Sequence, residues 1–132
     1  MRMREVDAGL VLGVVVWRVG KFVQCLLLRL CQHRHQAQVC ADGVACRVPV
    51  AASLDIIRAG AAHILRVTDS EVRAAIRCYY ECTHNITEGA GATPLAALLQ
   101  ERDAMAGRRV GLMLTGANID RVMLAEILGS DK

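Results

Sequence analysis

A run of small residues near the C-terminus, Thr115-Gly116-Ala117-Asn118, combines a hydroxyl group with a flexible backbone. It follows a mostly apolar stretch, residues 108–114, that predicts a strand, and it precedes a helical pattern over residues 119–128. Ligands of parallel α/β sheets bind where strands end and helices begin. The run is therefore the strongest site candidate that the pattern offers, and a plain connecting turn is the alternative.

Cysteines and histidines form a second group that could do chemistry, as metal ligands. Cys31, His33 and His35 are close in the sequence, and Cys40 and Cys46 follow. Their spacing matches no paired Cys-x-x-Cys pattern, so zinc binding is not favoured.

Two further cysteines, Cys78 and Cys82, are four residues apart on a predicted helix and share one face. This position predicts buried free thiols. Acidic residues near the N-terminus, and the lack of a small-residue cleavage site after the first apolar run, argue against a signal peptide. We therefore expect reduced thiols and a cytoplasmic protein.

Lysine is scarce, because only Lys21 and Lys132 contribute to the 16 basic residues. An enzyme that forms a covalent imine with a cofactor or substrate needs a lysine amine. This sequence offers two candidates for such a group, and one of them is the terminal residue.

The composition allows one small domain. The chain has 132 residues, of which 54% are hydrophobic, 22% charged and 3% aromatic, with a net charge of +3. A high apolar content with a low net charge excludes a disordered chain. The small basic excess and the few aromatic residues disfavour nucleic-acid binding. Charged residues interrupt the N-terminal apolar run, so no membrane span is expected.

The chain changes in character near residue 40. Residues 1–40 show no clear period, although residues 11–17 favour a strand and residues 22–30 a strand or a helix. From residue 41 onward the signals agree with an α/β order whose apolar strands suggest a parallel sheet buried on both faces. The expected elements are a helix 54–59 capped by Ser53, a strand 63–67, a helix opened by Thr68 or Asp69, glycine turns at 89 and 91, a helix 94–104 begun by Pro94, a strand 108–114 and a helix 119–128.

Five motifs occur in one order. They are Ala41-Asp42-Gly43-Val44-Ala45, then Ile56-Ile57, then Ile64–Val67 with Asp69-Ser70-Glu71-Val72, then Glu88-Gly89-Ala90-Gly91-Ala92, then Leu114-Thr115-Gly116-Ala117-Asn118-Ile119-Asp120. The series resembles the C-terminal part of the threonine/serine dehydratases, which are pyridoxal-phosphate enzymes of fold type II (tryptophan synthase β-like). The resemblance covers roughly residues 41–130. It implies a partial, truncated three-layer α/β domain with a parallel sheet.

The resemblance also implies roles for individual residues. Thr115, with Gly116 in the same turn, would place its hydroxyl on the pyridine nitrogen of the cofactor, where the family more often has serine. Glu88 would lie beside the cofactor ring, and Gly43 and Asp42 would form a turn past the cofactor and the substrate. For Glu88 the alternative is an acid favoured by a helix N-terminus, and for Asp42 it is turn chemistry.

Two parts of the family pattern are missing from the sequence. Neither lysine lies in a Ser-x-Lys-x-Arg-Gly-like stretch, and no glycine-rich run that could hold a phosphate occurs before residue 40. We therefore expect a C-terminal fragment that alone neither binds pyridoxal 5'-phosphate covalently nor deaminates amino acids. Residues 1–40 are expected to be atypical, either frame-shifted or disordered, and residues 41–132 to be the dehydratase part.

The resemblance implies β-elimination of L-threonine or L-serine to a 2-oxo acid and ammonia in the full enzyme, with a small amino acid as substrate. Serine racemase and related hydroxy-amino-acid dehydratases are alternatives within the family. A non-catalytic remnant that binds a partner through exposed sheet edges is the alternative from another class. No nucleic acid, membrane or metal is expected, and a homo-oligomer is left open.

Overall fold

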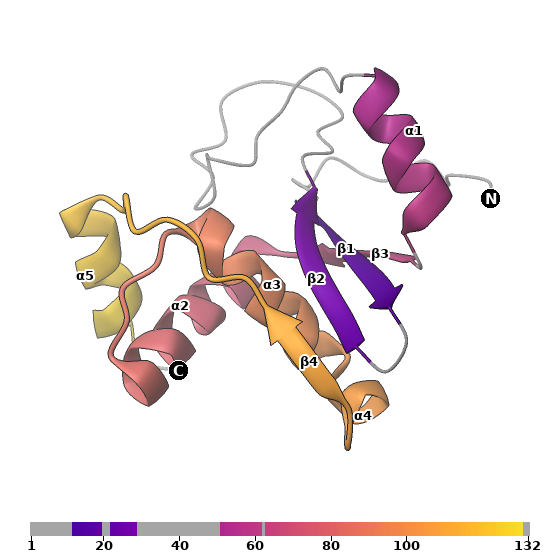
Figure 1. The fold of residues 1–132 in the computed structure, drawn as a ribbon. Coiled ribbons are helices and arrows are strands. Elements are labelled where there is room, and N and C mark those ends of the chain that lie inside the picture. The colour runs from indigo at the N-terminus through magenta and orange to yellow at the C-terminus, as the bar shows by residue number, and fades with distance from the viewer. Residues whose placement is uncertain (1–11, 20–21, 29–50, 62, 131–132) are drawn as a thin grey trace.

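The computed structural model describes residues 12–19, 22–28, 51–61 and 63–130 (Figure 1). They contain a four-stranded sheet in the order β3-β1-β2-β4. The strands are β1 (Leu12–Val19), β2 (Phe22–Leu28), β3 (His63–Val67) and β4 (Arg109–Leu112). The strand expected at 63–67 is confirmed, and the ambiguous stretch from residue 22 is a strand.

The sheet is mixed, which corrects the expected parallel arrangement. β2 and β4 pair in parallel, whereas β1 pairs antiparallel with both β2 and β3. Only Gly20 and Lys21 separate β1 from β2, and so short a link allows only an antiparallel pair. These pairings leave β2, β3 and β4 running in the same direction, so their carboxyl ends face the same edge of the sheet.

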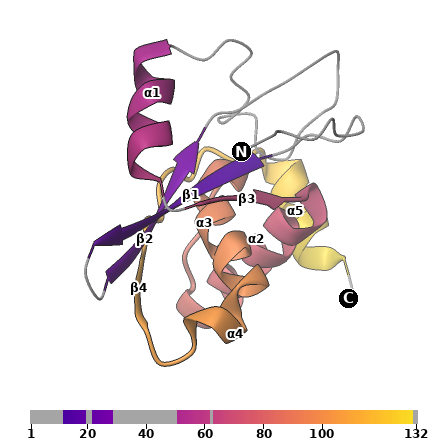
Figure 2. The same ribbon diagram turned by 90° about the vertical axis from the view of Figure 1, so that its right-hand side faces the viewer.

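The helices are α1 (Ala51–Gly60), α2 (Asp69–Thr83), α3 (Gly89–Gln100), α4 (Arg102–Met105) and α5 (Arg121–Gly129). In both views α2, α3 and α5 lie together on one side of the strands, and α1 stands apart from them (Figures 1 and 2). None of the helices in the described ranges is long and apolar enough to cross a membrane.

Two helices begin earlier than expected. α1 begins at Ala51, so Ser53 lies inside the helix rather than capping it, because two alanines favour the extra residues. α3 begins at Gly89, so Pro94 lies within the helix and the two glycines do not end a segment there. Pro94 has no N–H to donate to the carbonyl of Ala90, so packing rather than helix propensity must account for this start.

The strand expected at residues 108–114 is also shorter than expected. β4 covers Arg109–Leu112, and its residues alternate between exposed and half-buried. This alternation means that one face of the strand meets the rest of the described chain and the other face is exposed. Burial of this strand on both faces is therefore not observed.

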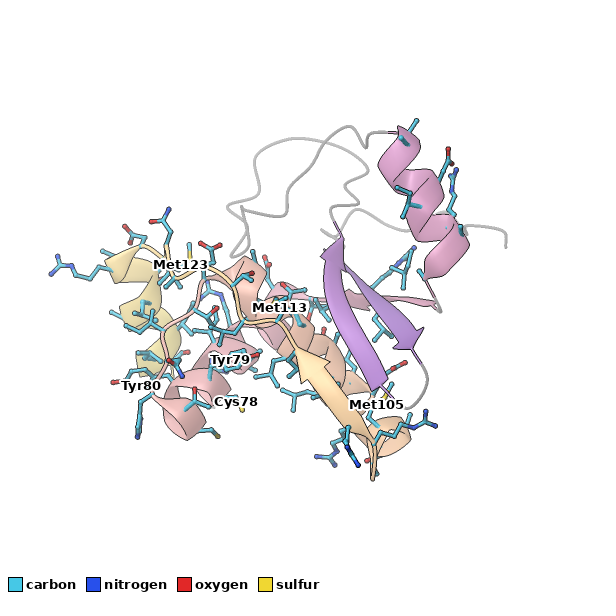
Figure 3. All side chains as sticks on the ribbon, in the orientation of Figure 1. Cys78, Tyr79, Tyr80, Met105, Met113 and Met123 are labelled. Carbon is cyan, nitrogen blue, oxygen red and sulfur yellow. The ribbon has the colours of Figure 1, made fainter. Side chains whose placement is uncertain are left out.

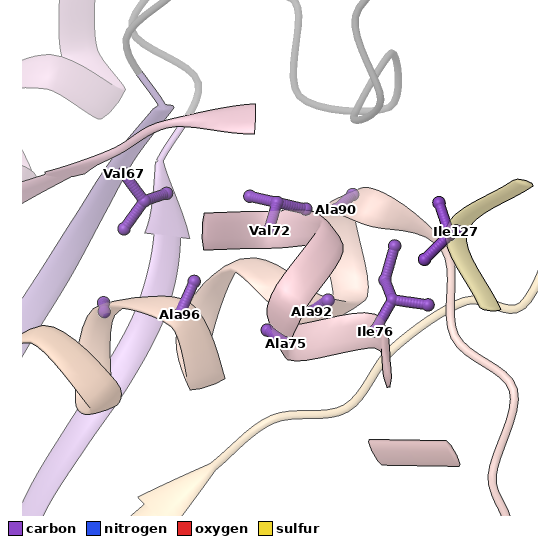
Figure 4. Close-up of a cluster of buried hydrophobic side chains, with 9 residues drawn as sticks. Val67, Val72, Ala75, Ile76, Ala90, Ala92, Ala96 and Ile127 are labelled. Atoms are coloured by element: carbon purple, nitrogen blue, oxygen red, sulfur yellow. The ribbon is translucent and has the colours of Figure 1, made fainter. Parts of the chain in front are cut away.

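The buried core joins α2 and α3 to the end of β3 and to α5 (Figure 4). Its side chains are small or β-branched: Val67, Val72, Ala75, Ile76, Ala90, Ala92, Ala96, Ala97 and Ile127. Alanines on α3 face α2, which lets the two helices approach closely. The same helix α3 therefore has one side against α2 and can present its N-terminus to another segment.

The start of α2 forms a capping box at Thr68, one of the two residues expected to open this helix. The Glu71 backbone N–H donates to the Thr68 hydroxyl at 3.3 Å, and the Thr68 N–H donates to the Glu71 carboxylate at 2.6 Å. Gln100, at the end of α3, donates to the other carboxylate oxygen of Glu71 at 2.8 Å and to the carbonyl of Arg66 at 2.7 Å. One carboxylate thus connects the end of β3, the start of α2 and the end of α3.

Glu71 should make the stability of the fold depend on pH. Partial burial raises the pKa of Glu71, but hydrogen bonds from the Thr68 backbone, Gln100 and the Thr68 hydroxyl outweigh it and lower the pKa below the ordinary value. A lowered carboxyl pKa stabilises the fold above the unfolded pKa, and this stabilisation is lost as pH falls through the folded pKa. We expect Glu71→Gln to lower the free energy of unfolding at neutral pH by up to about 1 kcal/mol, because the group is partly exposed.

The measurement is urea denaturation of both proteins from neutral to acidic pH. The difference between them should shrink as the pH falls below the ordinary carboxyl pKa. Glu126→Gln, which removes one exposed negative charge on α5, is the matched control. A difference between wild type and Glu71→Gln that stays constant over the acidic range would contradict the assignment.

Candidate functional site

The segment after β4, residues 113–120, passes over the N-terminus of α3. The Glu88 backbone N–H donates to the Gly116 carbonyl at 3.1 Å. The buried Thr87 hydroxyl lies 3.3 Å from the Gly116 carbonyl and 3.2 Å from that of Glu88, and donates to one of them. These contacts connect two parts of the chain that are far apart in sequence.

Gly91 makes this approach sterically possible. A Cβ atom at this position would overlap the carbonyl oxygen of Thr115 and the hydroxyl oxygen of Thr87. Gly91 lies in the first turn of α3 and is buried. The sequence pattern placed a turn at Gly91. The structure instead requires glycine at this position because the backbone of Thr115 comes close to it.

Gly116 is restricted in two ways. Its φ is +76°, a left-handed conformation that favours glycine. A Cβ atom there would also overlap the carboxylate of Glu88, so the Glu88 side chain packs directly against Gly116. The structure thus brings together three of the predicted site residues, Glu88, Thr115 and Gly116. Asp42 and Gly43 lie outside the described residues.

The polar groups of this cluster remain available for a ligand. Thr115 is exposed, and its hydroxyl makes no hydrogen bond to the described part of the chain. Glu88 is half-buried at the N-cap position of α3, but its side chain makes no capping hydrogen bond. Glu88 thus lies at the positive end of the helix, which agrees with the alternative interpretation of this acid, although its side chain does not cap the helix.

The far end of the segment is fixed by α5. Asp120 caps this helix, and its carboxylate accepts hydrogen bonds from Val122 N at 2.7 Å and Met123 N at 3.2 Å. The helix begins at Arg121, two residues later than the sequence pattern predicted. β4 at one end and the Asp120 cap at the other therefore hold the segment that carries Thr115.

Thr87 is a residue of this site that the sequence did not single out. It is completely buried, and its hydroxyl lies between Gly91 and Gly116. A buried threonine next to a glycine-rich helix start could have signalled a backbone contact, but its partner, 29 positions along the chain, could not be identified from the pattern.

The metal-binding candidates gain no support. The described residues hold no group of three or more side chains that could bind a metal ion. Cys31, His33, His35, Cys40 and Cys46 lie outside those residues. Cys78 and Cys82 are free as expected, but Cys78 is half-buried and Cys82 exposed, so the expected burial is wrong. Figure 3 shows the place of Cys78 on α2. Both cysteines follow the buried stripe of α2 toward its C-terminal end, beyond Ile76.

Comparison with known proteins gives the family. The family described as "Pyridoxal-phosphate dependent enzyme" matches residues 12–116. The chain is 39% identical over 80 residues to the L-threonine ammonia-lyase of Geobacter sulfurreducens, covering 61% of this chain and 20% of that protein. It is 38% identical over 78 residues to the phenylserine dehydratase of Ralstonia pickettii, covering 58% and 24%.

A longer alignment reaches the L-threonine dehydratase catabolic TdcB of Staphylococcus aureus, with 25% identity over 122 residues, 89% of this chain and 35% of that protein. The chain thus spans between a fifth and about a third of the length of these relatives. It belongs to the fold type II pyridoxal-phosphate-dependent enzymes of the threonine/serine dehydratase family. The α/β class expected from the sequence is confirmed.

Substituting Gly91 tests the close contact directly. We expect Gly91→Ala to lower the free energy of unfolding by about 1–3 kcal/mol, because the added methyl group meets the Thr115 carbonyl, which cannot rotate away. Chemical denaturation measures the change. The control is Gly129→Ala, at the end of α5, where nothing lies within 4 Å of the added atom. Equal effects of the two substitutions would show that the contact at Gly91 does not stabilise the fold.

Proposed function

We propose that this chain is the C-terminal part of a pyridoxal-phosphate-dependent dehydratase of hydroxy amino acids, and that its Thr115 hydroxyl binds the ring nitrogen of the cofactor. The observation that carries the proposal is the contact of residues 115 and 116 with the start of α3. This contact fixes the backbone of Thr115 and leaves its hydroxyl exposed.

The residues present fit this part of the cofactor. A hydroxyl can both donate and accept one hydrogen bond, so Thr115 suits a ring nitrogen in either protonation state. Thr115 carries no charge, so it would not hold that nitrogen protonated as a carboxylate would. Pyridoxal phosphate, when bound, supplies an electron sink for negative charge at the α-carbon of an amino acid. A neutral partner keeps this sink moderate, which suits β-elimination.

Glu88 is proposed to have a positioning role, different from that of Thr115. Its carboxylate packs on Gly116, and it therefore lies beside the residue that presents the ring-binding hydroxyl. Glu88 would border the ring and fix the turn, while Thr115 makes the hydrogen bond. Gly43 and Asp42 complete the proposed cofactor and substrate side, on the basis of the family motif.

We further propose that the substrate of the complete enzyme is a hydroxy amino acid such as L-threonine or L-serine, with a 2-oxo acid and ammonia as products. The names of the relatives support this class of substrate. The only lysines of the sequence are Lys21 and Lys132, and neither matches the family motif for the reactive lysine. The chain by itself is therefore proposed to be inactive.

A second candidate function, a non-catalytic interaction module, is favoured by one observation. β4 is an edge strand of the described sheet, and Met113 and Leu114, which follow it, are 49% and 39% exposed. An unpaired strand edge with neighbouring apolar side chains can bind another chain. This alternative predicts binding of a partner without restored catalysis.

The experiment adds the missing part in trans. The N-terminal part of the Geobacter sulfurreducens L-threonine ammonia-lyase, ending before its matched segment, is mixed with this chain and pyridoxal phosphate. Ammonia release from L-threonine and L-serine is measured. We expect none from either part alone and measurable release from the mixture.

Two variants test the assigned residue. Thr115→Ser, which keeps the hydroxyl, should keep most of the restored activity. Thr115→Val, which has nearly the same shape without the hydroxyl, should lower it by roughly 10-fold or more, the cost of one lost hydrogen bond to the reacting system. Ammonia release by this chain alone, or equal activity of the serine and valine variants, would overturn the proposal. Binding of the two parts without activity would favour the interaction module.

A further inference from the structure

α2 carries two thiols on one face of its C-terminal half. Cys78 and Cys82 are one helical turn apart, and their Sγ atoms are 3.9 Å from each other. Both are free, and Cys82 is exposed. An atom with bonds of about 2.3 Å to two sulfurs holds those sulfurs about 3.3–3.8 Å apart, for bond angles between a right angle and the tetrahedral angle. Binding of both thiols to such an atom therefore needs only a small approach of the two sulfurs.

The helix keeps the two thiols in this arrangement. α2 has a capping box at its start and ends at Thr83, and the N–H of the next residue, His84, donates to the Tyr80 carbonyl at 3.0 Å. Tyr79, between the two cysteines in sequence, packs against the buried core. Neither sulfur has to move far to bind, so little conformational freedom is lost when both engage one ligand.

The surroundings of the thiols select the kind of ligand. Burial raises the pKa of the Cys78 thiol, and the neighbouring Cys82 and Glu81 raise it further. A raised pKa disfavours the thiolate form of Cys78, whereas metal cations bind thiolates and release protons. No third metal-binding side chain joins the pair within the described part of the chain. A ligand that reacts with a thiol directly, without needing a thiolate of Cys78, fits better than a divalent cation.

We propose that Cys78 and Cys82 form a two-thiol binding site for trivalent arsenic compounds that carry one organic substituent. In water such a compound has two hydroxyl groups on arsenic. Each thiol replaces one of them: an arsenic–oxygen bond breaks, an arsenic–sulfur bond forms, and the thiol proton leaves with the hydroxyl as water. Arsenic stays trivalent, with one bond to carbon and two to sulfur. The site includes neither Thr115 nor Glu88 and does not depend on the proposed catalytic function.

The probe is phenylarsine oxide, applied to the whole folded chain in the presence of excess 2-mercaptoethanol as a competing monothiol. Free thiols are then alkylated, and the chain is cleaved with trypsin. Cleavage after Arg77 and Arg102 gives a peptide that holds Cys78 and Cys82 and none of the other cysteines. Mass spectrometry of this peptide measures how far phenylarsine oxide protects the two thiols. We expect joint protection of both.

The control variant is Cys78→Ser with Tyr80→Cys, which keeps two cysteines in the same peptide but places them on different faces of the helix. Tyr80 is 43% exposed, so its replacement spares the core. We expect the variant to need at least about tenfold more phenylarsine oxide for equal protection. In concentrated guanidinium chloride this difference should disappear. Equal protection of the two folded proteins, or a difference that persists after unfolding, would overturn the proposal.

Discussion

The close approach of one backbone segment to the start of a helix is the constraint on which this structure depends. Residues 115 and 116 lie against the first turn of α3, and the Glu88 N–H binds the Gly116 carbonyl. Two positions without a side chain, Gly91 and Gly116, leave the space for this contact. On its other side, α3 presents alanines to α2, so the helix is held between the core and the site.

In this arrangement the residues that hold the segment in place differ from the residue proposed to bind the cofactor. Thr87, Gly91 and the Glu88 backbone hold the segment, and none of them has to leave its place for a ligand to bind. Thr115 has an exposed hydroxyl on a fixed backbone, which limits the positions it can take. A group on a fixed support loses little entropy on binding, and this favours precise contact with a ring atom. The proposed role in binding the cofactor relies on this property.

Local signals in the sequence predicted the central elements well. β3 lies where its residue types place it, and α2 begins at the Thr68 cap, because both depend on neighbouring residues. The start of α3 was mispredicted because Gly89 and Gly91 were interpreted as turns, while contact with a distant segment explains the glycine at position 91. The antiparallel pairing of β1 with β2 follows from the two-residue link between them. The sequence did not reveal this pairing, because the bounds of the two strands were not known. The candidate site was predicted in part: the family motif pointed to Glu88, Thr115 and Gly116, but the motif could not reveal Thr87, whose role arises from tertiary contact.

The most direct test of the central contact compares two glycines that share a backbone conformation. Gly116 and Gly107 have φ values of +76° and +73°, but only Gly116 has an atom of another residue within 4 Å of an added Cβ. Gly107→Ala should lower the free energy of unfolding by about 1 kcal/mol, the cost of a left-handed alanine. Gly116→Ala should lower it by about 1–3 kcal/mol more, because Glu88 must also move. Equal losses in chemical denaturation would contradict the account that the contact between this segment and α3 holds the site together.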